Sequence, residues 1–318
     1  MREKTSRILR SFQEKIIDTR LLDMIERKIC HVYRLTMPPT FIVGPPRSGS
    51  TLVYQILVLF YKFSYLTNFS ALCPSLPGTM TLLSRPLYKP QSRLKPSNYG
   101  FISGPWSPNE GGAIMSKWFG DRGSGNPWIS VAAISEITDA PFINKNTYNS
   151  GRINKILQYF PKAIILHVWR DLLSNVASCY RTARQFPGYF FGYYPIETSL
   201  VPTNDIFSRE VNRVVQIHRE ILAGLNSSGF GVVDVQYEAL CDNPSETLKN
   251  IEKQFISHGL KLERRKSILP KLKKGNSTSY LNRQEMNTLK KLINETRKDC
   301  QEDMNALFPR NLEKANTH

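Results

Sequence analysis

Cysteine is scarce in this sequence, and its placement argues against a fold stabilised by zinc or by disulfide bonds. The 318 residues include five cysteines, which are scattered and never stand in C-x-x-C spacing. This arrangement indicates neither a zinc site nor a disulfide framework. Scattered thiols fit a reducing compartment, so we expect a cytoplasmic protein that holds no metal.

Long apolar runs are missing as well. The most apolar segment, residues 52–63, is interrupted by Gln55 and Lys62. It is too short to span a bilayer, which takes about 20 residues. The first thirty residues are charged throughout and show no secretory signal. We therefore expect a soluble protein whose contact with a membrane is at most peripheral.

Acidic residues are few compared with basic ones. Asp and Glu number 26 against 43 Lys and Arg, which gives a formal net charge of +17. Such an excess fits nucleic acid, an anionic membrane surface or a small polyanion as the partner. The basic residues are interleaved with apolar ones and form no long block, which favours small anionic ligands. We expect no nucleic-acid partner.

Residues 1–38 are predicted to form a basic amphipathic helical arm that precedes a domain at 39–318. Apolar residues between Leu9 and Ile29 recur at helical spacing, and Pro38-Pro39 end the pattern. The arm either packs on the domain or lies against a membrane surface or another subunit. Four acidic residues dilute its positive face and favour packing: Glu14, Asp18, Asp23 and Glu26.

The rest of the chain alternates apolar strand-like segments with amphipathic helical ones. Strands are predicted at residues 41–44, 141–145, 163–169 and 231–235, and helices at 52–60, 150–159, 172–184, 208–225 and from 244 onwards. This alternation predicts a single α/β domain with a central parallel β-sheet flanked by helices. Ligands then bind at the edge where the strands end.

The segment 41–52 has the layout of a phosphate-binding loop. A strand ending at Gly44 is followed by a loop with two prolines and then by an apolar helix. The loop amides and the helix N-terminus converge on one point, where the helix dipole favours an anion. Gly44 and Gly49 are spaced as in G-x-x-x-x-G-K-[ST], but Ser50 replaces the lysine that nucleoside triphosphatases need. The loop therefore favours phosphate binding over phosphoryl transfer.

Two segments together resemble one enzyme family. The sequence PRSGSTL at 46–52 resembles the 5′-phosphosulfate loop of sulfotransferases that use 3′-phosphoadenosine 5′-phosphosulfate (PAPS). The sequence FPKAIILHVWRD at 160–171, followed by Ser178, resembles the 3′-phosphate segment of that family, where a strand ends in arginine before a helix. The resemblance covers roughly residues 40–260 and implies a P-loop-like sulfotransferase fold.

The resemblance implies an enzyme that moves a sulfonate group from PAPS, its co-substrate, to a hydroxyl or amine of an acceptor. The acceptor would be a small molecule or a glycan, with carbohydrates and glycolipids as candidate classes. Residues 73–126, dense in proline and glycine, would form an insertion that shapes the acceptor site. Two alternatives stay open: a P-loop phosphotransferase or nucleoside triphosphatase, and a non-catalytic basic protein that binds membrane or nucleic acid.

The same resemblance implies which residues hold the nucleotide. The 5′-phosphosulfate would be bound by Pro46, Arg47, Ser48, Gly49, Ser50 and Thr51. Arg170 and Ser178 would hold the 3′-phosphate, unless Arg170 only forms a salt bridge with a nearby carboxylate. The basic segment that ends in Lys274-Gly275 would close over the nucleotide, or is a solvated helix end.

Three residues are candidates for the chemistry: Arg47, Lys145 and Glu110. Arg47 would stabilise charge on the bridging oxygen, and Lys145 resembles the lysine before the acceptor base in the cytosolic branch. That branch has a histidine two residues later, where this sequence has Thr147. Glu110 resembles the glutamate base of the carbohydrate and tyrosine branches, although Lys145 and Glu110 also suit exposed surface positions. His167 lies inside a strand, so we expect a packed core histidine.

Overall fold

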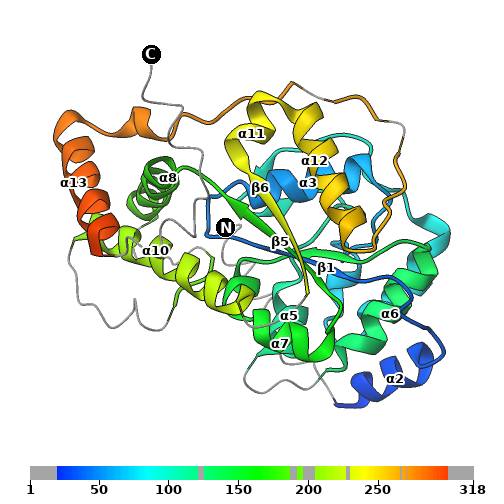
Figure 1. Cartoon of the computed structure of the whole chain (residues 1–318). Helices are drawn as coiled ribbons and strands as arrows, with labels where there is room; N and C mark the ends of the chain where they lie inside the picture. The colour runs from blue at the N-terminus through cyan, green and yellow to red at the C-terminus, as the bar shows by residue number, and fades with distance from the viewer. Residues whose placement is uncertain are drawn as a thin grey trace.

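The protein is built around a four-stranded sheet in which all strands are parallel (Figure 1). The computed structural model describes residues 20–120, 125–186, 192–195, 205–226, 230–265, 267–269 and 271–299. The strands are β1 (Thr40–Val43), β4 (Ile143–Lys145), β5 (Ile164–Trp169) and β6 (Gly231–Gln236), in the spatial order β4-β1-β5-β6. The predicted α/β fold with a central parallel sheet is confirmed.

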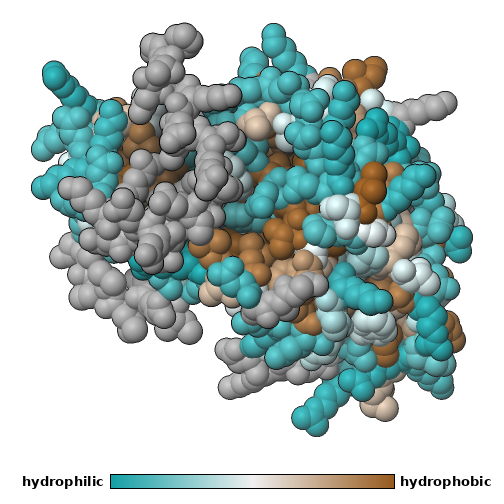
Figure 2. Space-filling view, viewed as in Figure 1, coloured by the Kyte–Doolittle hydropathy of each residue, from teal (hydrophilic) through white to brown (hydrophobic). Residues whose placement is uncertain are grey.

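Helices cover both faces of this sheet (Figure 1). One face carries α3 (Ser50–Phe60), α11 (Tyr237–Asp242) and α12 (Pro244–Ser257), and the other carries α5 (Gly112–Phe119), α6 (Pro127–Thr138), α7 (Ile153–Tyr159) and α10 (Ile206–Leu225). Beside α10 lie α8 (Leu172–Gln185) and α13 (Arg283–Asp299). Figure 2 shows hydrophilic residues over most of the rim and apolar ones in the middle, where β5 and β1 lie in Figure 1.

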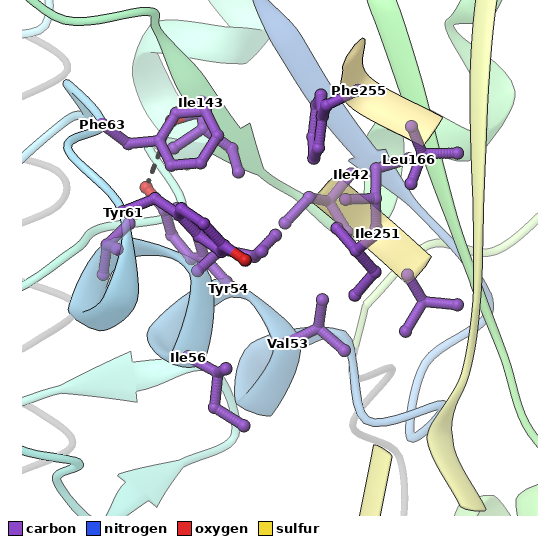
Figure 3. Packing of buried hydrophobic residues seen from close by; sticks show 14 of the residues in the cluster. Ile42, Val53, Tyr54, Ile56, Tyr61, Phe63, Ile143, Leu166, Ile251 and Phe255 are labelled. Atoms are coloured by element: carbon purple, nitrogen blue, oxygen red, sulfur yellow. Dashed lines mark hydrogen bonds between the residues drawn. The ribbon is translucent and has the colours of Figure 1, made fainter. Parts of the chain in front are cut away.

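Both faces of β1 and β5 are buried, which explains why their sequences are almost continuously apolar. In β1, Ile42 packs against α3 and α12, whereas Phe41 and Val43 pack toward α5, α6 and α10. In β5, Leu166 and Ile165 divide between the two faces in the same way. Figure 3 shows the hydrophobic core on the face that α3 and α12 cover, where side chains from these helices and from the strands meet.

The proline-rich segment 73–126 holds more regular structure than its sequence pattern indicates. It contains α4 (Pro77–Ser84), α5 and a short hairpin of β2 (Ser97–Asn98) and β3 (Phe101–Ile102). The described 3₁₀ helices are η1 (Ser70–Leu72), η2 (Arg85–Leu87), η3 (Thr147–Gly151) and η4 (Thr278–Tyr280). Pro77 and Pro127 stand at the start of α4 and α6, where the missing N–H costs no hydrogen bond. Proline therefore starts helices here.

Within the predicted arm, the structure describes α2 (Arg20–Cys30), which packs on α4 and α6. Residues 1–19 lie outside the described ranges. Glu26 and Cys30 of α2 are buried, and Asp23 pairs with Lys117 of α5 at 3.1 Å. Of the helices in the described ranges, none has the length and apolar character to cross a membrane.

Candidate functional site

The predicted phosphate loop follows β1 at the carboxyl edge of the sheet and leads directly into α3. Its backbone takes the left-handed region at Arg47 (φ +67°) and at Gly49 (φ +93°). A Cβ atom added at Gly49 would lie 2.2 Å from Cδ2 of Tyr237. Glycine is therefore required at this position both by the backbone conformation and by the packed ring.

Side chains from two other elements fix the shape of the loop. Nδ2 of Asn175 donates to the carbonyl of Pro46 at 2.8 Å, and the amide of Gly44 donates to Oγ of Ser150 at 3.1 Å. Burial raises the pKa of Cys179 to about 12, so its thiol stays protonated and donates to the same Pro46 carbonyl. The loop is thereby held in place before any ligand arrives.

The start of α3 is suited to an anion. Gly49 precedes the helix, and its carbonyl accepts from the amide of Leu52 at 2.9 Å. The amides of Ser50 and Thr51, at the very start of α3, have no intrahelical acceptor, and the helix dipole adds partial positive charge there. Within the described residues, the buried hydroxyl of Ser48 has no hydrogen-bond partner. This end of the helix can therefore donate several hydrogen bonds to a phosphate or sulfate group.

The two sequence segments that resemble the nucleotide sites lie in direct contact. Nε of Arg47 donates to Oγ of Ser178 at 3.1 Å, although the residues are 131 positions apart. Nη1 of Arg170 donates to the carbonyl of Arg47 at 3.3 Å. The guanidinium of Arg47 also lies 5.6 Å from the ring centre of Tyr99. The fold thus gathers Arg47, Arg170 and Ser178 at one position beside the loop.

Arg170 is the most connected cation of this group, and it is buried. Its Nη2 atom donates to the carbonyl of Gly275 and to Oγ of Ser277, each at 2.9 Å. Its Nε atom lies 3.7 Å from Oε1 of Glu238 but has no hydrogen-bond partner within the described residues. Burial raises the pKa of the Glu238 carboxyl. Arg170 therefore has the nearby carboxylate that the alternative of a simple salt bridge requires. Its Nε donor nevertheless has no hydrogen-bond partner within the described residues.

Tyr237 joins three parts of this site, and sequence reasoning missed it. Its ring packs on Gly49 and lies 4.6 Å from the guanidinium of Arg170, while its hydroxyl accepts from the amide of Gly275 at 3.2 Å. The sequence could have indicated Tyr237 as a site residue, because it directly follows β6 and so lies at the same carboxyl edge of the sheet. Ser277 gave no such signal, since it belongs to an irregular segment far along the chain.

Glu110 and Lys145 form an ion pair between their side chains. Lys145 ends β4 and is buried, so the alternative of a solvated lysine at the end of a strand is wrong. The backbone carbonyl of Glu110 accepts from Nδ2 of Asn144 at 3.2 Å and from Nδ2 of Asn146 at 3.1 Å. The Glu110 side chain is 26% exposed, so the carboxylate is held in position and remains accessible.

The order of the strands places the Glu110–Lys145 pair and the Arg170 cluster on opposite sides of the phosphate loop. Lys145 ends β4, the loop follows β1, Arg170 follows β5 and Tyr237 follows β6, and β1 lies between β4 and β5. The Glu110–Lys145 pair is therefore on one flank and the Arg170 cluster on the other. This arrangement can bind an anionic ligand centrally and present a carboxylate to a second molecule at one side.

Two sequence candidates lie apart from this cluster. Lys274 is exposed and pairs with Asp242 at 3.3 Å, so its neighbour Gly275 makes the contact with Arg170 instead. His167 is buried as expected, with Nδ1 2.9 Å from Oδ1 of Asp234. The described residues contain no group of three or more histidine, cysteine or acidic side chains that could hold a metal ion.

These features define an α/β protein with an anion-binding site at the carboxyl edge of a parallel sheet. The model of the sulfotransferase family matches residues 38–256, which is more than half of the chain. The chain therefore belongs to the sulfotransferase family, as the two sequence segments predicted. Membership indicates a transferase that moves sulfonate groups.

Solved structures with a similar fold belong to bacterial sulfotransferases. One is sulfotransferase STF9 from Mycobacterium avium, with 15% identity and a TM-score of 0.50 over 74% of this chain and 68% of that one. Another is sulfotransferase STF1 from Mycobacterium tuberculosis H37Rv, with 15% identity and a TM-score of 0.50 over 89% of this chain and 80% of that one. At this identity the likeness concerns the fold alone. No curated protein sequence matches the chain significantly.

Proposed function

We propose that this protein transfers a sulfonate group from PAPS to a hydroxyl or amine of an acceptor. The observation that supports the proposal best is the contact between Arg47 and Ser178, with Arg170 bound to the Arg47 carbonyl. The residues that resemble the 5′-phosphosulfate and 3′-phosphate sites come from separate elements, yet they meet at one place. A nucleotide with phosphates at both positions suits that convergence.

The residues present fit such a nucleotide. The amides at the start of α3, with the hydroxyls of Ser50 and Thr51, would bind the 5′-phosphosulfate. Arg170 and Ser178 would bind the 3′-phosphate, and the unused Nε donor of Arg170 supports this role because a buried donor needs an acceptor. Gly275 would contribute through its backbone, while the exposed position of Lys274 makes it the weakest member of the proposed set.

The proposed reaction divides between the two flanks of the loop. PAPS, when bound, supplies an activated sulfonate and a nucleotide leaving group. Arg47 would donate to the bridging oxygen as negative charge develops on it, and Lys145 would add a second positive charge. Glu110 would accept the proton of the acceptor, and its ion pair with Lys145 keeps the carboxylate oriented for that step.

The acceptor would approach on the Glu110 side, and residues 73–126 would shape its site. We propose a small molecule or a glycan, with carbohydrates and glycolipids first, because Glu110 resembles the base of the carbohydrate and tyrosine branches.

A cytoplasmic location is also proposed: Cys30, Cys73, Cys179 and Cys241 are all free, which suits a reducing compartment.

The proposal is tested by incubating the purified chain with PAPS and a panel of phenols, sterols, oligosaccharides and glycolipids. The expected result is release of 3′-phosphoadenosine 5′-phosphate that depends on one acceptor class and yields a sulfated product. A phosphotransferase would instead consume ATP, and Ser50 at the position of the Walker lysine argues against that outcome. ATP turnover without use of PAPS would overturn the proposal.

A further inference from the structure

The inward face of α2 is polar, and its contacts fix the helix on the domain. Oε1 of Glu26 accepts from the Gly78 amide at 2.8 Å and from Oγ of Ser130 at 2.6 Å. Oε2 of Glu26 accepts from the Thr79 amide at 3.0 Å and from the Thr79 hydroxyl at 2.7 Å. Glu26 thus caps the start of α4 from a neighbouring helix. Because α2 is held in this way, its outward face is set by the fold.

The outward face of α2 is apolar and exposed. The large apolar side chains exposed on α2 are Leu21 (64%), Met24 (66%), Ile25 (36%) and Ile29 (37%), and Val32 (59%) follows in the turn after the helix. Steps of three and four residues place these side chains on one stripe. At the lower right of Figure 2, where α2 lies in Figure 1, apolar and hydrophilic residues are interspersed at the surface. Several large apolar side chains exposed together on one helix face indicate an interaction surface.

The exposed charges on residues 20–34 are of one sign. Both acidic residues of α2 point inward, since Glu26 binds α4 and Asp23 pairs with Lys117. The exposed ionisable residues between positions 20 and 34 are all basic: Arg20, Arg27, Lys28, His31 and Arg34. The acidic residues of this helix therefore do not dilute its outward positive charge. An acidic side chain lies nearby in Glu136 of α6, which accepts from the Arg34 amide.

We propose that α2, with residues 31–34, docks the protein on a membrane surface that carries anionic lipids. The apolar stripe would lie among the lipid headgroups and the flanking cations would contact lipid phosphates and carboxylates, as amphipathic interfacial helices do. Charge complementarity favours this occupant over a second copy of a chain that carries a net charge of +17. In Figure 1, α2 lies at the end of the molecule where β1 begins, so docking leaves the carboxyl edge open. This inference does not rest on the proposed function.

The test is co-sedimentation of the full chain with phosphatidylcholine vesicles, with and without phosphatidylserine. Binding is expected to be about tenfold stronger, or more, when phosphatidylserine is present, and to weaken as salt is added. Equal binding to both vesicle types, or no dependence on salt, would overturn the electrostatic part of the proposal and with it the choice of an anionic surface.

Two variants and a matched control locate the surface. Leu21→Ser with Met24→Ser should lower vesicle binding about tenfold or more, because two inserted side chains are lost. Arg27→Gln with Lys28→Gln should lower binding to the anionic vesicles only. Ile256→Ser, which changes an apolar residue of α12 that is 53% exposed, should bind as wild type does. All these positions are exposed, so melting temperatures should stay unchanged.

The other occupants of the stripe give different results. Absence of vesicle binding together with a dimer in light scattering would assign the stripe to a second copy. Absence of binding by a monomer would assign it to the first 19 residues of the same chain. Either result, or a Leu21→Ser, Met24→Ser variant that binds vesicles as wild type does, contradicts the proposal.

Discussion

Nε of Arg47 donates a hydrogen bond to Oγ of Ser178, and this contact joins the phosphate loop after β1 to the middle of α8. If α8 contributes to nucleotide binding, Ser178→Ala should weaken the binding of 3′-phosphoadenosine 5′-phosphate about tenfold, the effect of one hydrogen bond to a charged group. Ser174→Ala, one turn earlier on the same helix, is the control, and its affinity for the nucleotide in titration calorimetry should equal that of the wild type. Equal affinity of Ser178→Ala and wild type would separate α8 from the nucleotide.

Arg47 should matter more for turnover than for the fold. Arg47 is an exposed residue of the loop, so removal of its side chain creates no buried cavity. Arg47→Ala is expected to lower turnover by roughly two to three orders of magnitude, the usual effect of removing one donor that stabilises developing charge. A steady-state assay with PAPS and an identified acceptor measures this. A variant that retains more than half of wild-type turnover would show that the arginine is only structural.

Glu110 and Lys145 should behave as a coupled pair because their side chains form one ion pair. Glu110→Gln should lower turnover by about 10²–10⁴-fold, the contribution of a general base, while nucleotide binding stays intact. Adding Lys145→Met to Glu110→Gln should cost much less than Lys145→Met alone, because contacting residues are not additive. If Glu110→Gln turns over normally and its pH–rate profile keeps the same acidic limb, the base lies elsewhere.

Gly49 should tolerate no side chain. Its φ is +93° and an added Cβ would lie 2.2 Å from the Tyr237 ring, so Gly49→Ala must move the ring that also contacts Arg170. We expect loss of nucleotide-induced stabilisation in a thermal shift assay. Gly112→Ala is the matched control, since a Cβ there meets no atom within 4 Å. Unchanged nucleotide stabilisation in Gly49→Ala would contradict the packing described for the loop.

His218 should make the protein less stable in acid. Burial, with a smaller effect from His167, lowers its pKa from 6.5 to about 3. The unfolded chain therefore takes up a proton below pH 6.5 that the folded chain refuses, so this stability is complete above pH 6.5 and declines toward pH 3. At pH 5 the loss should reach about 2 kcal/mol. Urea unfolding at pH 7 and pH 5 should show a smaller difference in His218→Gln, and an equal difference would exclude this histidine as the cause.

The sheet and the loop could be predicted because local sequence determines them. A strand buried on both faces has a continuous apolar sequence, as β5 does, and the predicted strands 163–169 and 231–235 correspond to β5 and β6. The glycine spacing likewise placed the loop at the end of β1. The helix α4 could not be predicted from a local pattern, because it begins at Pro77 within the proline-dense segment 73–126.

The contacts of the candidate site depend on tertiary structure that no local pattern contains. Ser277 reaches Arg170 only because the segment after α12 returns across the edge of the sheet. The pairing of Glu110 with Lys145 likewise joins residues 35 positions apart, on a loop and on a strand. The sequence could nominate Arg170, Glu110 and Lys145 by resemblance, whereas their actual partners follow from the packing of the folded chain.

We propose that the site binds a nucleotide with phosphates at both the 3′ and 5′ positions. Thermal shift in the presence of 3′-phosphoadenosine 5′-phosphate, compared with AMP and ATP, tests it most directly. At about 100 times its dissociation constant the bisphosphate should stabilise the fold by roughly 2.7 kcal/mol, and AMP at the same concentration should stabilise it far less. Equal stabilisation by AMP and by the 3′-phosphorylated nucleotide would contradict the account of Arg170 and Ser178.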